Sequence, residues 1–170
     1  VTDTSCTALM LLAGKVHEKG FKVALTGEGS DEWLAGYPWY KIDRVLEWLG
    51  AISGGTIDAA IRRRFFTWLG CNKDAVAYLD RCAPSAGGAH PFQRFYDLLG
   101  ASRFRFYSGD MLGELGDHDP YADFAPDLGR AERWHPINRA IYWAGRIHLP
   151  GQLLSLKGDR IAMSQSVEMR

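Results

Sequence analysis

The sequence predicts a chain that is mostly α-helical with one or two strands and that forms part of a larger α/β domain. Apolar residues recur at helical spacing over most of the chain, whereas residues 21–25 form one short β-branched, apolar run bounded by glycines. Such a run is typical of a buried parallel strand, which needs partner strands and crossover helices. Because one strand cannot make a sheet and both ends resemble cuts through folded sequence, we expect the rest of the sheet to lie outside residues 1–170.

The composition narrows the classes of function. Hydrophobic residues make up 46% of the 170 residues, and 20 Lys+Arg balance 20 Asp+Glu to a formal net charge of zero. This excludes intrinsic disorder and argues against a nucleic-acid partner, which would require a basic surplus. No run approaches the roughly 20 apolar residues that span a bilayer, so no membrane partner is expected. Three widely spaced cysteines fit a reduced compartment, and we expect the cytoplasm. Zinc ligation has little support, because there is no C-x-x-C and no i, i+4 pair of histidines.

Helical periodicity accounts for most of the remaining elements. The first helix is expected to begin at Asp3, Thr4 or Ser5 and to end at Gly20, and its nearly uniform apolar surface indicates burial. After residue 37, helices are expected over 38–50, over 57–70 and from Asn72 to before Pro84. Two short helices, broken near Gly100, are expected within 91–115. A further helix is expected from 137 until Pro150 ends it, and residues 153–170 are expected to be helical in one or two pieces. Residues 84–91 and the acidic stretch 116–129 are expected to be loops.

The densest chemistry lies directly after the strand, in the run L-T-G-E-G-S-D-E at residues 25–32. Ligands of open α/β sheets bind at the carboxyl ends of strands. Gly27 and Gly29 permit a tight turn whose backbone N–H groups can hold phosphate. Glu28 and Asp31 would place carboxylates beside that phosphate, an arrangement that usually includes a bridging Mg²⁺. The same residue types are ordinary in loops and helix caps, so a purely structural turn stays open at this point.

Generic nucleotide motifs do not describe this run. The dinucleotide-binding pattern G-x-G-x-x-G needs a glycine where Glu32 stands, and a carboxylate there would repel pyrophosphate. The P-loop pattern that ends in Gly-Lys-Ser/Thr is absent from the sequence. A more specific pattern is therefore needed.

Residues 23–37, V-A-L-T-G-E-G-S-D-E-W-L-A-G-Y, resemble the strand–loop–helix block of the asparagine synthetase family, usually S/T-G-E-G-x-D-E followed by two hydrophobic residues, x, G and Y. About 120 residues later, a second set resembles the family's L-P-x-x-L-L-x-x-x-D-R-x-x-M-x-x-S-x-E-x-R block: Leu149-Pro150, Leu153-Leu154, Asp159-Arg160, Met163, Ser166, Glu168 and Arg170. Two blocks in the right order and at about the right separation are much more specific than either alone. The stretch between them, about 45 to 145, carries no motif that we match to the family.

The resemblance implies that residues 1–170 are part of a synthetase domain with the parallel-sheet ATP-pyrophosphatase fold, related to the adenine nucleotide alpha hydrolases. It implies ATP-dependent amidation of aspartate to asparagine through a β-aspartyl-AMP intermediate, with Mg²⁺ as cofactor. Ammonia would come from glutamine through a glutaminase domain of the same full-length chain. By position, Thr26 and Gly27 resemble the residues that contact the adenylate of ATP. Glu28 resembles the catalytic carboxylate, and Asp31 resembles a Mg²⁺ ligand.

Parts of the family pattern are missing. The phosphate-gripping S-G-G-x-D-S loop and the glutaminase domain do not occur in residues 1–170, and the lysine used in adenylation is expected beyond Arg170. The isolated chain is therefore expected to be inactive, and neither Lys157 nor Lys41 is assigned the role of that lysine. Structural ion pairs and helix caps are the expected roles of four charged residues near the end: Asp159, Arg160, Glu168 and Arg170.

Two alternatives stay open. A β-lactam synthetase-like or peptide-cyclising relative would use the same adenylation on a different carboxylate, although the carboxylates within residues 28–32 favour the amidating type. A non-catalytic relative could act as a scaffold, but the intact Glu28 and Asp31 count against it.

Overall fold

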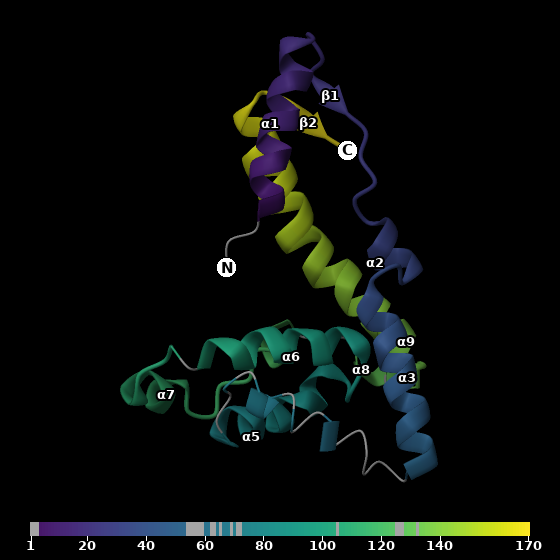
Figure 1. Cartoon of the computed structure of the whole chain (residues 1–170), viewed down its shortest axis with the longest axis vertical. Coiled ribbons are helices and arrows are strands. Elements are labelled where there is room, and N and C mark those ends of the chain that lie inside the picture. The colour runs from purple at the N-terminus through teal and green to yellow at the C-terminus, as the bar shows by residue number, and fades with distance from the viewer. Residues whose placement is uncertain are drawn as a thin grey trace. The chain divides into compact units, whose positions relative to one another are not determined.

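A computed structural model of the chain describes residues 4–53, 60–61, 64, 66–68, 70, 73–104, 106–124, 128–131 and 133–170. The chain divides into two compact units. Unit 1 comprises Val1–Gly36 and Ile141–Arg170, so the first and last segments of the chain fold together, and unit 2 comprises Tyr37–Ala140 (Figure 1). Most described residues are helical and two short strands pair in parallel, as the sequence predicts for a fragment of a larger α/β domain.

Unit 1 combines helices with the two strands. Its elements are α1 (Thr4–Glu18), β1 (Val23–Ala24), α2 (Ser30–Leu34), η3 (Ala144–Ala162) and β2 (Glu168–Met169). β1 and β2 pair with Val23 opposite Glu168 and Ala24 opposite Met169. The N–H of Arg170 donates to the carbonyl of Ala24 at 3.0 Å. α1 packs against η3, and a small core forms where three buried side chains meet: Ala13, Ala162 and Val167.

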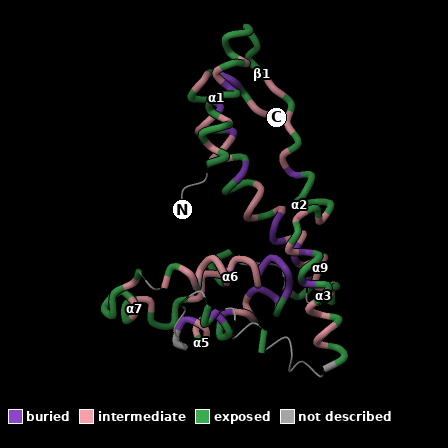
Figure 2. The backbone as a smooth tube through the Cα atoms, in the orientation of Figure 1, coloured by how far each residue is buried: buried purple, intermediate pink, exposed green. Residues whose placement is uncertain are grey.

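The burial expected for the first helix and the strand is wrong within this chain. Figure 2 draws α1 mainly in the colours of exposed and intermediate residues. Of the residues of α1, Ala13 alone is buried, whereas Leu11 and Leu12 are 65% and 61% exposed. Leu25, directly after β1, is 87% exposed. The parallel pairing of the strand is confirmed, but no described element of the chain covers these apolar surfaces. The pattern of apolar residues indicates only that such a segment prefers to be buried. It does not show which other part of a protein packs against it.

The last third of the chain also differs from the sequence-based expectation. α9 (Pro136–Trp143) continues into η3 without stopping at Pro150, and η3 is wound with i→i+5, π-type hydrogen bonding. Such winding is one way in which a helix accommodates an interrupted hydrogen-bond ladder. The helix then ends at Ala162 instead of running to residue 170. Ser166, with a positive φ of 57°, lies in the turn that leads into β2.

Unit 2 is helical. It contains α3 (Pro38–Ser53), α5 (Lys73–Cys82), η1 (Ala83–Ala86), α6 (Pro91–Phe104), α7 (Gly109–Leu115), η2 (Ala122–Phe124), α8 (Leu128–Ala131) and the first part of α9. The expected helices at 38–50 and from residue 72 are confirmed as α3 and α5. The break expected near Gly100 is wrong, because α6 passes through it and ends at Phe104. The helix expected over 57–70 lies largely outside the described residues; those that are described there are helical, apart from a turn at residue 70.

Aromatic stacking and one ion pair join α3 to α6. The indole of Trp39 stacks on the ring of Phe95, with centroids 4.2 Å apart, and on the ring of Tyr37 at 3.9 Å. The guanidinium of Arg94 donates to the carboxylate of Asp43, which is buried. A buried charge is stable only when it is paired and hydrogen-bonded, so this contact fixes how the two helices pack.

A buried histidine caps the beginning of α6. His90 is 1% exposed, and its Nδ1 accepts a hydrogen bond from the backbone N–H of Gln93 at 3.2 Å. The proton of the neutral ring therefore lies on Nε2, which donates to the carbonyl of Ala86 at 3.2 Å. Burial lowers the pKa of His90 to about 3, because a charged ring would lose its hydration and would place a proton against the Gln93 N–H.

We expect this histidine to make the protein sensitive to acid. The unfolded chain binds the proton near pH 6.5 and the folded chain only near pH 3, so the contribution of His90 is complete above pH 6.5. Below that pH it decreases by about 1.4 kcal/mol per pH unit. Urea unfolding at pH 7.5 and pH 5 should show this loss in the wild type and a smaller one in His90→Asn, which keeps a capping side chain. His118→Asn, at a half-exposed histidine, is the control. An equal loss in wild type and His90→Asn would contradict this assignment.

Candidate functional site

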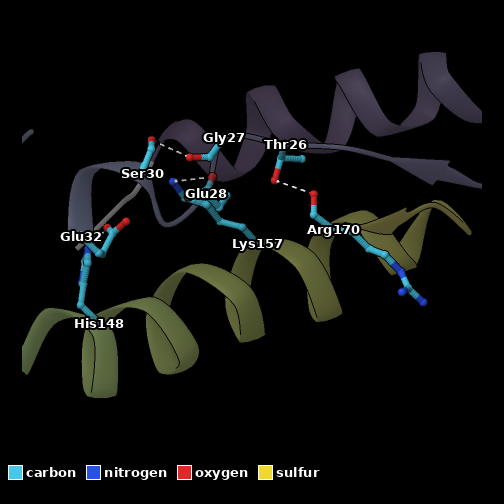
Figure 3. Close-up of polar contacts among 8 residues, drawn as sticks. All are labelled: Thr26, Gly27, Glu28, Ser30, Glu32, His148, Lys157 and Arg170. Carbon is cyan, nitrogen blue, oxygen red and sulfur yellow. Dashed lines mark hydrogen bonds and ion pairs between the residues drawn. The ribbon is translucent and has the colours of Figure 1, made fainter. Parts of the chain in front are cut away.

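The candidate site is the loop that joins β1 to α2, shown in Figure 3. Its first residue with a side-chain contact is Thr26, whose backbone N–H donates to the carbonyl of Arg170 at 2.7 Å. The hydroxyl of Thr26 donates to the same carbonyl at 3.4 Å. These bonds continue the β1–β2 ladder by one residue, so the loop leaves from the carboxyl end of a parallel strand. That is where ligands bind in open α/β sheets.

A tight turn follows. The N–H and the hydroxyl of Ser30 both donate to the carbonyl of Gly27, at 3.2 and 2.8 Å. Gly29 has a φ of 98°, and a Cβ built there would lie 3.4 Å from a methyl carbon of Leu149. The backbone conformation therefore favours glycine at this position, and a Cβ there would make only an ordinary van der Waals contact with η3. Among the described residues, nothing accepts a hydrogen bond from the backbone amides of Gly27, Glu28 or Gly29.

The side chain of Glu28 points from this loop toward η3, where it meets Lys157 (Figure 3). The Nζ of Lys157 lies 3.9 Å from the Oε1 of Glu28, and the two side chains are 19% and 26% exposed. Partial burial lowers the effective dielectric constant, so this pair interacts more strongly than a solvent-exposed one. The sequence assigns no role to Lys157, whereas the structure places its side chain against the predicted catalytic carboxylate.

A second contact with η3 lies one turn further along, at α2. Glu32 is 1% exposed, and its Oε1 lies 3.7 Å from the Nε2 of His148. Burial lowers the pKa of His148, and the neighbouring carboxylate of Glu32 opposes that shift. The chain thus buries a carboxylate beside a histidine at the junction of α2 and η3, a contact that the motif did not indicate.

The geometry of η3 explains why Lys157 and His148 escaped detection. They are nine residues apart, which in an α-helix would put them on opposite faces. Winding with i→i+5 bonds takes more residues per turn, and both side chains point toward the loop and α2 (Figure 3). An α-helical pattern in the sequence therefore could not place these two residues on one face. No sequence pattern indicated that η3 has π-type winding.

Asp31, the predicted Mg²⁺ ligand, lies in the first turn of α2 and is exposed. Its carboxylate folds back over Gly36, where any side chain would collide with it. The described part of the chain contains no group of three or more His, Cys, Asp or Glu that could hold a metal ion. Mg²⁺ bound between a carboxylate and substrate phosphates needs no such group, since one or two protein carboxylates suffice. The exposed carboxylate of Asp31 fits that mode.

The packing of α2 on η3 depends on a glycine. A Cβ at Gly145 would lie 2.7 Å from the Cη2 of Trp33, so the indole of α2 lies directly on the backbone of η3. We expect Gly145→Ala to displace this indole and to be less stable than Gly151→Ala by about 1–3 kcal/mol. Gly151, in the same helix, has open space around its Cβ position, so its substitution changes only helix propensity. Urea unfolding of both variants measures the difference, and equal stability would contradict the close contact.

The remaining expectations near this site have mixed outcomes. The predicted structural ion pair between Glu168 and Arg170 is confirmed, with a guanidinium nitrogen 2.8 Å from Oε1. The structure brings Thr26, Gly27 and Glu28 together in one loop, with Asp31 in the helix that follows. Their roles toward nucleotide, substrate and metal stay predictions. No described helix is long and apolar enough to cross a membrane.

Known proteins resemble the chain over its whole length. A sequence model of the family described as asparagine synthase matches residues 1–170. The chain is 26% identical over 190 residues to the amidase chry2 of Gibberella zeae and 27% identical over 179 residues to the amidase chyE of Penicillium rubens, covering 99% of the chain in both cases. It spans about a quarter of the length of these curated relatives, 26% of each. No solved structure matches the chain.

Proposed function

Because the chain belongs to the asparagine synthase family, we propose that the protein amidates aspartate to asparagine with ATP, through a β-aspartyl-AMP intermediate and with ammonia from glutamine. Membership of this family supports a ligase-type activity in amino-acid biosynthesis. The observation that carries the proposal is the loop after β1, which combines three backbone amides without a partner among the described residues and the carboxylate of Glu28.

Each predicted residue has a place in this reaction. Thr26 and Gly27 line the start of the loop, where the amides of residues 27–29 can donate to phosphate oxygens of ATP. A carboxylate oxygen of aspartate attacks the α-phosphorus, and pyrophosphate leaves. Asp31 would hold Mg²⁺, which neutralises charge that develops on the departing pyrophosphate.

The second half of the reaction needs a base. Ammonia attacks the acyl carbon of the adenylate, the bond to AMP breaks, and the nitrogen must lose a proton. Glu28 is the candidate acceptor, since it lies in the loop at the carboxyl end of β1 and its side chain is only partly exposed. Glutaminase activity, which would supply the ammonia, is proposed for another domain of the same full-length protein, acting in the cytoplasm.

The names of the relatives favour a second candidate. Both are called amidases, which is consistent with amide chemistry on a carboxylic acid other than aspartate. The loop would perform the same adenylation, and only the acid that receives the nitrogen would differ. The two candidate functions thus differ in which carboxylic acid is the substrate.

The test uses the full-length protein with ATP and Mg²⁺ and follows pyrophosphate release with and without aspartate. We expect release that depends on aspartate and yields asparagine when glutamine or ammonium is added. A panel of other carboxylic acids forms the second arm, and release with one of them but not with aspartate would support the second candidate. ATP hydrolysis that no carboxylic acid stimulates would contradict both.

A further inference from the structure

Lys157 has no role in the proposal above, yet it is the cation that faces the predicted catalytic carboxylate. We infer that Lys157 is a positioning residue for Glu28, an inference that rests on the proposed function. Its ammonium group lies 3.9 Å from the Oε1 of Glu28, and 129 residues separate the two in the sequence. Both side chains are largely shielded from water. The attraction between the two charges therefore has to compensate for the hydration that each of them loses.

The backbone around Glu28 explains why it needs an external restraint. Glycines flank it on both sides, and Gly29 adopts a left-handed conformation that only glycine takes up readily. A side chain between two glycines has little local packing to fix its rotamer. Among the described residues, its side chain contacts Lys157 in η3. The contact with η3 therefore restrains the side chain of Glu28, which the loop alone would leave free to change rotamer.

η3 is a suitable support because it is fastened to the same segment at two further points. Leu149 approaches Gly29, and His148 faces the buried Glu32. Lys157 lies on the same side of η3 and adds a third contact, with Glu28 in the loop (Figure 3). The position of Glu28 is thus set by three contacts to one helix.

The charges around the pair favour this assignment. Glu28 and Glu32 bring two carboxylates to this side of η3, and burial lowers the pKa of His148, which faces Glu32. Lys157 brings a basic side chain to the same side of η3, where its Nζ faces the carboxylate of Glu28. Orienting this carboxylate and holding nucleotide phosphate are two different roles for Lys157, and they predict different effects of its removal on ATP binding.

The experiment compares variants of the full-length protein, using the carboxylic acid that supports pyrophosphate release. Lys157→Met keeps the aliphatic length and removes the charge. It should lower amide formation by about 10- to 100-fold through misplacement of Glu28, with ATP affinity and the KM of the acid near wild type. Lys157→Arg should restore most of the activity. Lys15→Met is the matched control, because Lys15 pairs with Glu18 in an exposed contact on the surface of the same unit.

A double-mutant comparison separates positioning from a general structural effect. In the Glu28→Gln background, Lys157→Met should cause no further loss, measured as residual turnover of radiolabelled acid. A further full loss, an unchanged Lys157→Met, or a fall in ATP affinity that parallels the fall in turnover would each overturn the inference. A wild-type protein that releases no pyrophosphate with any carboxylic acid would instead refute the proposed function, so the two failures are distinguishable.

Discussion

Glu28→Gln should lower amide formation by about 10²- to 10⁴-fold, the range attributed to a general base, while ATP binding stays close to wild type. Glutamine has nearly the shape of glutamate but cannot accept the proton that leaves the attacking ammonia. The amides of residues 27–29 are untouched by the change, so phosphate contacts should persist. Product formation and ATP affinity, measured on the same preparation, give the result.

Glu18→Gln is the matched control for this prediction. Glu18 also pairs with a lysine, but its side chain is 62% exposed and it lies in α1. An exposed pair contributes about 0–1 kcal/mol to stability, so this variant should behave as wild type in both assays. Unchanged turnover in Glu28→Gln would remove Glu28 from the mechanism.

Asp97→Ala should destabilise unit 2 by about 3–5 kcal/mol, because the buried amide of Gln93 and the partly buried hydroxyl of Tyr121 would lose their acceptor. Asp97 is 1% exposed; its carboxylate accepts from the side-chain amide of Gln93 and, at 2.8 Å, from the hydroxyl of Tyr121. Burial, and then the Asp97 carboxylate, raise the pKa of Tyr121, so this hydroxyl stays a donor at neutral pH. Urea unfolding measures the change.

Two further variants separate burial from the loss of a carboxylate. Tyr121→Phe removes one donor and should cost about 1.5–3 kcal/mol, and combined with Asp97→Ala it should cost less than the sum. Asp117→Ala removes a carboxylate that also has a partner, Arg81, but whose side chain is 99% exposed. A stability loss from Asp97→Ala as small as that from Asp117→Ala would show that the buried network contributes little.

Sequence patterns predicted the helices of unit 2 where local signals are strong. Pro38 at the first turn and the recurring apolar residues that follow specify α3, and Pro84 lies just beyond the end of α5 at Cys82. Gly100 shows the limit of this reasoning. A glycine in a helix costs only about 1 kcal/mol, which the packing of α6 against α3 and α5 can outweigh, so the helix passes through it.

The candidate site was predictable only where the chain is contiguous. Thr26, Gly27, Glu28 and Asp31 lie within six residues and share one motif, so the structure necessarily places them near one another. Lys157 joins them through a contact across 129 residues and through winding that no α-helical pattern describes. β2 was missed for a related reason: a two-residue strand is defined by its partner β1, not by its own sequence.

The central claim is that this protein joins a carboxylate to AMP, and isotope transfer tests it most directly. Aspartate labelled with ¹⁸O in its side-chain carboxylate is supplied to the full-length protein with ATP, Mg²⁺ and ammonium, and the AMP produced is analysed by mass spectrometry. Because the carboxylate oxygen attacks the α-phosphorus and stays with it when ammonia displaces AMP, we expect one ¹⁸O atom in each AMP formed. AMP without the label, or a reaction that releases ADP and labelled phosphate instead, would contradict the account.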